Sequence, residues 1–202
     1  TNVTVLFTME ITSAMIKELR DTTGISVMQC KKALEEAGGD MEKATIILKK
    51  KRSEAADKKS DREIGAGAVG VYLHNTNEVA ALVKLGCETD FVAKNVDFVA
   101  LANDIAMHVA AMAPKYITRE EVPAEAIEKA KEVFAAEVAE KPADMQEKIM
   151  EGKLASYFKD QILMDQPFVK NPDTTIAEMV SGGVQKFGEN VTVAEITRVA
   201  VK

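Results

Sequence analysis

The side chains in this sequence that are best suited to covalent chemistry are its two cysteines and two histidines. A cysteine thiolate becomes a nucleophile when a histidine nearby removes its proton, and Cys87 with His74 is the pair that a shared β-hairpin would bring together. Cys87 continues the apolar alternation of its segment, which favours a buried core thiol. His74 ends its segment beside a turn, and contact with a partner is its better functional interpretation. A cysteine enzyme is retained as one hypothesis.

The patterns for metal and nucleotide chemistry are weak. A zinc site would need Cys30, His74, Cys87 and His108 together, and their spacing has no chelating pattern. His108 lies about 120° from the centre of the apolar stripe of its helical segment, which predicts a position on the polar side. The glycines of segment 65–70 precede a strand instead of joining a strand to a helix, and no Walker A lysine motif occurs. We predict no catalytic residue, no metal and no cofactor, so a binding role is favoured.

Length, charge and composition limit the class of protein. A chain of 202 residues can form one or two domains, and its net charge of −6 does not favour non-specific binding to nucleic acid. No run approaches about 18 consecutive apolar residues, so no membrane span is expected. Residues 1–8 lack the pattern of a signal peptide, and two distant thiols fit a reducing compartment. We therefore predict a cytoplasmic protein.

The segment 10–52 predicts three short helices. Thr12 or Ser13 can cap the first, Ser26 the second and Asp40 the third. Met28 points about 140° away from the apolar stripe of its helix, which predicts an exposed side chain. Apolar residues at helical spacing are expected to form the core: Met15, Ile16, Leu19, Val27, Cys30, Leu34, Ala37, Met41, Ala44, Ile47 and Leu48. Such a bundle is near the lower size limit for independent folding.

A run of charge follows these helices. Segment 49–62 holds seven basic and three acidic residues without an apolar stripe. This composition is typical of a solvated helix end followed by a linker. Attraction to an acidic or phosphate-bearing partner is the alternative interpretation.

The apolar period then changes from helical to strand-like. Segments 69–74 and 79–87 flank a turn signal, which predicts a β-hairpin. Segment 191–201 predicts another strand, and the change of parity between Val193 and Ile196 indicates a bulge or a short turn. Helices are expected between these strands: one after an N-cap at Asn95, then 124–138, 143–164 and one from 174. Strands scattered among helices predict an α+β fold with an antiparallel sheet.

Segment 89–95, Thr-Asp-Phe-Val-Ala-Lys-Asn, lies where the strand-like run gives way to a helix-like one. Phe91 places a large apolar ring beside Asp90 at this junction. The ring could complete the core or be held out toward a partner. From the pattern alone, core filling is the better interpretation.

Five segments, in the same order, resemble the bacterial elongation factor Ts family over about residues 9–202. Segment 11–51 resembles the amino-terminal ubiquitin-associated-like (UBA-like) three-helix domain of that family. CETDFVAKN at 87–95 resembles its central signature. The later segments are IAMHVAA at 105–111, EKIMEGKL at 147–154 and DQPFVKNP at 165–172.

The resemblance implies a guanine-nucleotide exchange factor, which makes and breaks no bond. In the family, the Asp-Phe pair of the signature is inserted beside the magnesium and phosphate site of elongation factor Tu. Asp90 and Phe91 occupy these positions, with Thr89 and Val92 beside them. The resemblance therefore reverses the preference for core filling by Phe91.

It also implies further contacts with elongation factor Tu. In the family, the amino-terminal helices dock on the partner, and Ile25, Val27 and Met28 are the candidates here. His74 matches a histidine of longer relatives that touches the partner. Val27 and Gln29 stand where relatives often carry Met and Asp, which is a departure from the docking pattern.

The resemblance also predicts the domain organisation and the assembly. We expect an extension at 1–8, a UBA-like helical domain at 9–52, a charged linker at 53–66 and an α+β core domain at 67–202. The chain has room for a single core, and short relatives of this kind form homodimers, so a homodimer is expected. The alternative function is a UBA-like adaptor without exchange activity, which would need only the helical domain.

Overall fold

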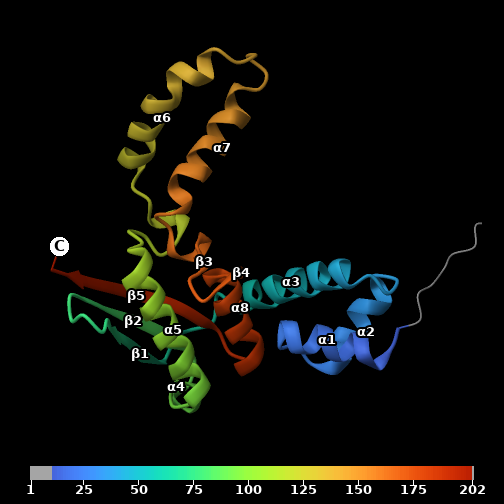
Figure 1. Cartoon of the computed structure of the whole chain (residues 1–202). Helices are drawn as coiled ribbons and strands as arrows, with labels where there is room; N and C mark the ends of the chain where they lie inside the picture. Colours follow the sequence, from blue (N-terminus) through green and yellow to red (C-terminus); the bar gives the residue numbers. More distant parts are fainter. Residues whose placement is uncertain (1–10, 202) are drawn as a thin grey trace, which may run out of the picture. The chain divides into compact units, whose positions relative to one another are not determined.

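The computed structural model describes residues 11–201, so the predicted extension at 1–8 lies outside the described residues (Figure 1). The chain divides into two compact units, one ending at Lys58 and the other beginning at Lys59. Each unit has its own core, and the two are described separately below.

The first unit contains helices α1 (Ser13–Thr23), α2 (Val27–Glu36) and α3 (Met41–Asp57). The side chains of Thr12, Ser26 and Asp40 each accept a hydrogen bond from the backbone N–H three residues later, so each helix starts at a satisfied cap. Gly24 ends α1 in the left-handed conformation, with φ of 68°. The helix α3 includes much of the charged run and ends only at Asp57.

The core of this unit lies between the helices. It consists of Leu19, Ile25, Cys30, Ala33, Leu34, Ala44 and Leu48. The expectation that Val27 belongs to this core is wrong, since its side chain is 49% exposed. Val27 is the first residue of α2, and Ile25 from the preceding loop fills the core at that end, with an exposure of 4%.

The second unit is built on a three-stranded sheet of order β1-β2-β5. Strands β1 (Ala66–Leu73) and β2 (Val79–Cys87) form the predicted antiparallel hairpin, and β5 (Val191–Ala200) pairs with the other edge of β2. Lys84 pairs with Glu195 while Leu85 pairs with Val193, so Ala194 is an extra residue in β5. This β-bulge confirms the irregularity predicted from the change of parity.

Helix α5 (Val96–Met112) packs across the inner face of the sheet. Its buried Phe98, Ala102, Ile105 and Val109 face the buried residues of β2. The closest approach is at Gly70 of β1, where a Cβ atom would lie 2.1 Å from the carbonyl oxygen of Ala102. Beside this point, the Asn103 Oδ1 accepts a hydrogen bond from the Val71 N–H at 2.9 Å. The helix is therefore fixed both by packing and by a polar contact to the edge strand.

The position of His108 corrects the prediction from the apolar stripe of α5. The side chain is fully buried rather than on a polar side. Its Nε2 lies 2.8 Å from the Gln166 Oε1, and the Val169 N–H donates to its Nδ1 at 3.2 Å. These partners flank β3 (Pro167–Phe168) and belong to a segment that covers a second side of α5. A single stripe does not predict this second covering layer.

Two further helices form an antiparallel hairpin, and a last one returns to the sheet. The hairpin consists of α6 (Ala124–Ala139) and α7 (Gln146–Lys159), which pack on each other. The helix α7 ends at Lys159 and not at 164, because the chain there enters a bridge between Ile162 and Tyr116 and the short helix η2 (Leu163–Asp165). Another short helix, η1 (Arg119–Glu121), precedes α6. Strand β4 (Asn171–Thr175) leads into α8 (Ile176–Phe187) through a capping box at Thr175.

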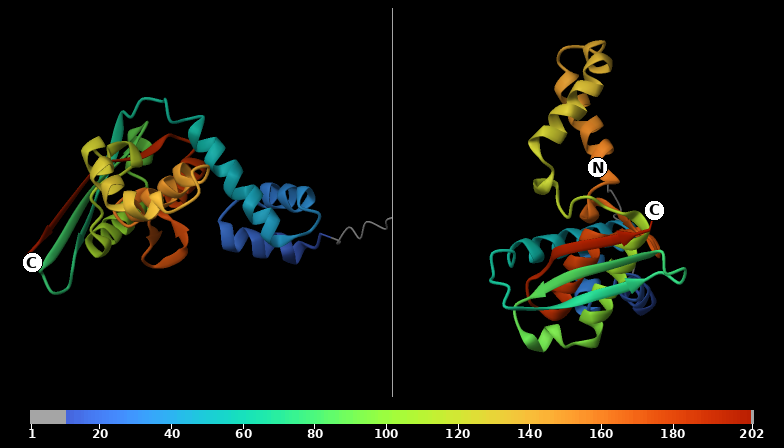
Figure 2. Two further views of the ribbon diagram at one scale, coloured as in Figure 1. Left: turned by 90° about the horizontal axis from the view of Figure 1, so that it is seen from above. Right: turned by 90° about the vertical axis from the view of Figure 1, so that its left-hand side faces the viewer.

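The fold confirms the predicted α+β class with an antiparallel sheet. Within the described residues of the second unit, 59–201, no helix lies across the outer face of the sheet in the right-hand view of Figure 2. This face carries apolar side chains that are each 45% exposed or more: Val69, Val71, Leu73, Leu82 and Val199. An antiparallel sheet that faced only water would carry polar residues there.

Candidate partner-binding site

Phe91 stands at the junction between β2 and α5, on the one-turn helix α4 (Asp90–Ala93). Its side chain is 87% exposed, so the interpretation of Phe91 as a core residue is wrong. The strand β2 ends in the buried Cys87, and no residue of α4 is buried, because this turn projects past the edge of the sheet. Full burial of a Phe side chain would contribute about 2–3 kcal/mol. Because the Phe91 ring stays exposed, it does not make this contribution to stability, and it is available to contact another molecule.

Asp90 places a negative charge beside this ring. Its Oδ2 lies 2.6 Å from the Lys94 Nζ, one helical turn on. The hydrogen bond and the charge of Lys94 hold the pKa of the Asp90 carboxyl below its ordinary value. Thr89 is exposed as well, whereas Val92 is half-buried. The predicted set 89–92 thus forms one exposed corner with an aromatic and an acidic side chain.

The chain just before this corner is held by the turn between α8 and β5. The Glu189 carboxylate accepts hydrogen bonds from the N–H groups of Glu88 and Thr89, each at 3.0 Å, and from the Thr89 Oγ1 at 2.6 Å. The sequence analysis did not identify Glu189. It lies about a hundred residues from the junction, and no local pattern around it points there.

A second set of contacts ties a third segment to the same turn. The Asn190 N–H donates to the Glu88 Oε1 at 2.6 Å, and the Asn190 side chain donates to the carbonyl oxygens of Ser60 and Arg62. Arg62 also pairs with Glu88 at 3.3 Å. The hydrogen bond from the Asn190 N–H is the main cause that lowers the pKa of the Glu88 carboxyl, and Arg62 lowers it further. Part of the expected linker at 53–66 therefore belongs to the base of the junction.

The structure contradicts the nucleophile–base pair of Cys87 and His74. Cys87 pairs with Ala66 at one end of the hairpin, while His74 follows Leu73, which pairs with Ala80 at the other end. Seven residues of extended strand separate the two ends by roughly 20 Å. Burial is the main cause that raises the pKa of the Cys87 thiol, and the negative charge of Glu189 raises it further. The raised pKa disfavours the nucleophilic thiolate.

The same geometry separates His74 from Phe91. His74 lies half-buried at the turn of the hairpin, where its Nδ1 is 2.9 Å from the Thr76 Oγ1 and its ring meets the Tyr72 ring edge-on. Phe91 follows the opposite end of β2. The two candidate contacts therefore lie at opposite ends of the sheet.

The candidate docking residues of the helical unit also differ in exposure. Met28 is 82% exposed, as its position on α2 predicted, and Val27 is partly exposed beside it in the sequence. Ile25 lies in the core of the unit, so its side chain is not available at the surface. The surface formed by these predicted residues is reduced to Val27 and Met28.

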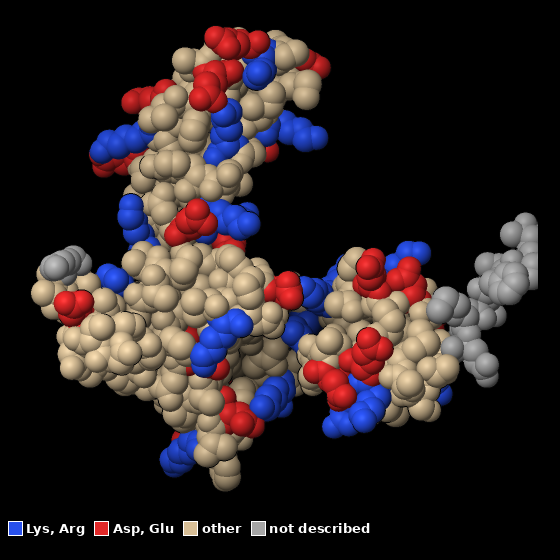
Figure 3. Space-filling model, in the orientation of Figure 1, with Lys and Arg blue, Asp and Glu red and all other residues tan. Residues whose placement is uncertain are grey.

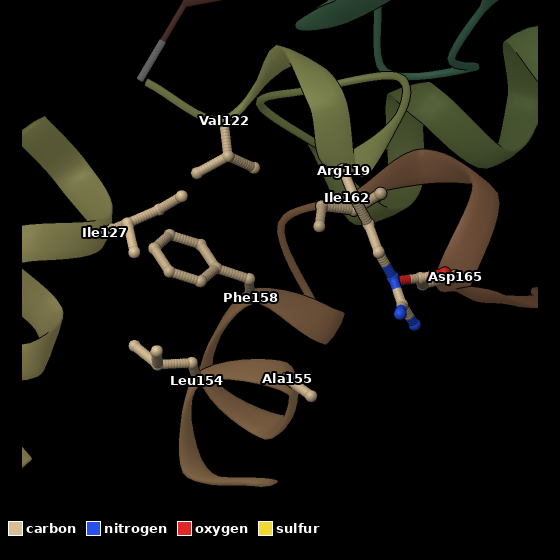
Figure 4. A pocket seen from close by; sticks show the side chains of 8 residues that line it. All are labelled: Arg119, Val122, Ile127, Leu154, Ala155, Phe158, Ile162 and Asp165. Carbon is tan, nitrogen blue, oxygen red and sulfur yellow. The ribbon is translucent and has the colours of Figure 1, made fainter. Parts of the chain in front are cut away.

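The helical hairpin carries a pocket at its base. The pocket has a volume of about 180 Å³, and Figure 4 shows Val122, Ile127, Leu154 and Phe158 directed toward it. Arg119 and Asp165 form an ion pair of 2.8 Å at its border. Further along the hairpin, acidic and basic residues are interleaved, as Figure 3 shows, and several form ion pairs within it.

Between residues 11 and 201, no group of three or more His, Cys, Asp or Glu side chains is arranged to hold a metal ion. No helix in this range combines the length and the apolar character that crossing a membrane requires. Cys30 and Cys87 are both buried free thiols.

These features define an α+β protein that presents an aromatic and an acidic side chain on a braced junction between strand and helix. The family model described as Elongation factor TS matches residues 9–202. Elongation factor Ts from Fervidobacterium nodosum is 47% identical to 96% of this chain, and the match spans 99% of that relative. The proteins of the same name from Carboxydothermus hydrogenoformans and Thermotoga petrophila are 47% and 45% identical, over 93% and 94% of this chain and over 88% and 96% of their own lengths.

The chain belongs to the elongation factor Ts family. Its role is that of a translation elongation factor in protein biosynthesis.

Proposed function

We propose that this protein is a guanine-nucleotide exchange factor that promotes the release of GDP from elongation factor Tu. The exposure of Phe91 beside Asp90 carries this proposal. These residues belong to the segment that resembles the family signature, and the pair enters the region of magnesium and phosphate of the partner. A braced base beneath the pair favours a wedge that keeps its shape on insertion.

The mechanism needs no covalent chemistry. A protein that binds the nucleotide-free conformation of its partner more tightly than the GDP-bound conformation lowers the affinity for GDP. Each tenfold loss of GDP affinity requires about 1.4 kcal/mol of such differential binding. Phe91 supplies apolar surface that becomes buried on insertion, and Asp90 supplies a negative charge that disfavours phosphate nearby.

The helical unit docks on elongation factor Tu in this proposal. Val27 and Met28 form the contact, since both side chains reach the surface. A methionine adapts its shape to an apolar groove and can compensate for the departures from the family pattern. Ile25 contributes by holding the loop before α2 against the core.

The active assembly is a homodimer. The outer face of the sheet supports this proposal, because Val71 and Leu82 lie opposite each other at its centre and both are about half-exposed. Packing of two such faces about a twofold axis would bury the same apolar residues on each copy. His74, at the far end of the sheet from Phe91, then adds a contact to the partner from the second copy.

The proposal is tested by the release of labelled GDP from elongation factor Tu. The wild-type protein is expected to accelerate release, and Phe91→Ala to reduce the maximal rate by roughly tenfold or more, as expected for about 1.4 kcal/mol or more of lost differential binding. The matched control is Val133→Ala, which removes another strongly exposed apolar side chain, on α6. Full acceleration by folded Phe91→Ala would exclude the wedge.

The UBA-like adaptor is the second candidate, and the exposure of Met28 favours it as much as it favours docking. The same assay separates the two functions. An exchange factor with Met28→Ala needs a higher concentration for half-maximal acceleration but reaches the same maximal rate. An adaptor binds elongation factor Tu without changing the rate of GDP release at any concentration.

A further inference from the structure

We infer that Glu189 is a positioning residue for exchange, which fixes the direction in which Asp90 and Phe91 leave the sheet. The inference rests on the proposed function, since it assigns a role to a residue that supports the same wedge. Glu189 lies in the turn between α8 and β5, a segment that none of the signature residues belongs to.

The N-cap residue of α4 is bonded to Glu189 instead of to the helix itself. Thr89 stands at the N-cap position of this one-turn helix, but its side chain makes no capping hydrogen bond to the helix. The Thr89 hydroxyl instead donates to the Glu189 Oε1, at 2.6 Å. A turn of four residues has too few internal hydrogen bonds to hold its own orientation. Its direction therefore depends on contacts outside the turn: packing on β1 and β2, the Cys87 Sγ at 3.2 Å from the Thr89 carbonyl oxygen, and the bonds to Glu189.

The single carboxylate of Glu189 accepts hydrogen bonds from three donors at the junction. The Glu189 Oε2 accepts the N–H groups of both Glu88 and Thr89, each at 3.0 Å, in addition to the hydroxyl on its other oxygen. Bonds to an ionised carboxylate are shorter and about twice as strong as neutral ones. Three donors from two consecutive residues fix the backbone immediately before Asp90.

Glu189 is itself held in place by its neighbours in the turn. It lies between Gly188, which ends α8 with φ of 75°, and Asn190, whose side chain is bound to the carbonyl oxygens of Ser60 and Arg62. The Lys59 Nζ donates to the Gly188 carbonyl oxygen at 2.9 Å. The carboxylate is thus mounted on a turn that is anchored on both sides.

The test compares Glu189→Ala and Glu189→Gln with wild type in the GDP-release assay, each with and without Phe91→Ala. Glu189→Ala is expected to lower the maximal acceleration by roughly tenfold, and Glu189→Gln by less, since it keeps one oxygen acceptor. In the Phe91→Ala background, the further loss should be less than about twofold, because Glu189 acts through the wedge. Glu132→Ala removes an exposed carboxylate on α6, outside the junction and the outer face of the sheet, and serves as the control.

A second readout measures position without the partner. Amide hydrogen exchange at Glu88 and Thr89, followed by NMR, should speed up in Glu189→Ala, while the amides of β2 keep their protection. If Glu189→Ala is too unstable for kinetic assays, the hydrogen-exchange measurement and the Glu189→Gln variant still test the inference. Unchanged protection, or a loss of acceleration equal in both backgrounds, would overturn the positioning role. Full activity of Phe91→Ala would instead reject the proposed function on which it rests.

Discussion

At the scale of single residues, the fold separates side chains that the sequence pattern treats alike. Phe91 follows the predicted strand 79–87 and Phe98 lies in the helix predicted after Asn95, and the apolar pattern favours a core position for both, yet Phe98 is fully buried and Phe91 is 87% exposed. The difference arises because Phe98 lies on the sheet-facing side of α5, whereas Phe91 lies on a turn beyond the sheet edge. His108 shows the reverse case, a histidine that tertiary contacts bury completely.

His108 predicts a pH dependence of stability. Burial lowers the pKa of its imidazole below the ordinary value of 6.5, although the bond to Gln166 acts in the opposite direction. The unfolded chain then binds more protons than the folded chain below about pH 6.5, so this contribution to stability is complete above that pH and is lost as the pH falls toward the folded pKa. As the pH is lowered from 7.5 to 5, urea unfolding should show that the free energy of unfolding falls more for the wild type than for His108→Gln. The same pH dependence of the free energy of unfolding in both proteins would contradict this prediction.

At the scale of elements, the relation between α5 and the sheet decides where the proposed wedge, Asp90 and Phe91, is presented. The helix begins at Val96, directly after the turn that carries Phe91, so any displacement of α5 from β1 changes the junction. Gly70 permits the close approach and Asn103 fixes the helix along the strand. A glycine is required at position 70 for lack of space and not for an unusual backbone conformation.

Gly70→Ala is expected to destabilise the protein by about 1–3 kcal/mol, since the added methyl group would overlap the backbone of Ala102. Chemical denaturation measures the change. Gly152→Ala is the matched control, because Gly152 lies within α7 with no atom within 4 Å of the added Cβ. That substitution should stabilise by about 0.5–1 kcal/mol, as alanine is the better helix former. Equal effects at both positions would contradict the packing argument.

At the scale of the whole molecule, two features are not explained by a single chain. The outer face of the sheet exposes apolar residues from both of its edge strands, including Val71 and Val199. The candidate contacts Phe91 and His74 lie at opposite ends of that sheet. A homodimer through the outer face accounts for both features, since each elongation factor Tu then meets Phe91 of one chain and His74 of the other.

This arrangement predicts complementation between two inactive variants. Phe91→Ala and His74→Ala are each expected to be impaired alone, and a mixture that exchanges subunits should recover about one quarter of the wild-type sites. The recovery arises because each mixed dimer pairs an intact Phe91 with an intact His74 at one of its two sites.

The control adds Val71→Lys to both variants, which places a charge in the proposed interface. Sedimentation velocity should then show a monomer, and the recovery should disappear. A mixture that regains no activity, while sedimentation shows subunits exchanging, would mean that one chain supplies both contacts.

Local structure follows from the sequence alone. The caps at Ser26 and Asp40, the hairpin of segments 69–74 and 79–87 and the bulge in β5 follow from short-range rules of hydrogen bonding and side-chain alternation. The exposure of Met28 also followed from helical geometry. Only the ordered resemblance, and not the pattern of apolar residues, indicated that Phe91 faces outward.

Contacts between distant segments appear only in the tertiary structure. These contacts cover His108 with the segment around Gln166 and bring Glu189 to the base of the junction at Thr89. These outcomes depend on contacts between residues tens to about a hundred positions apart, and the period of a single strand or helix carries no information about them. For that reason the sequence identified the candidate wedge residues, while only the structure showed the contacts that brace the segment just before them.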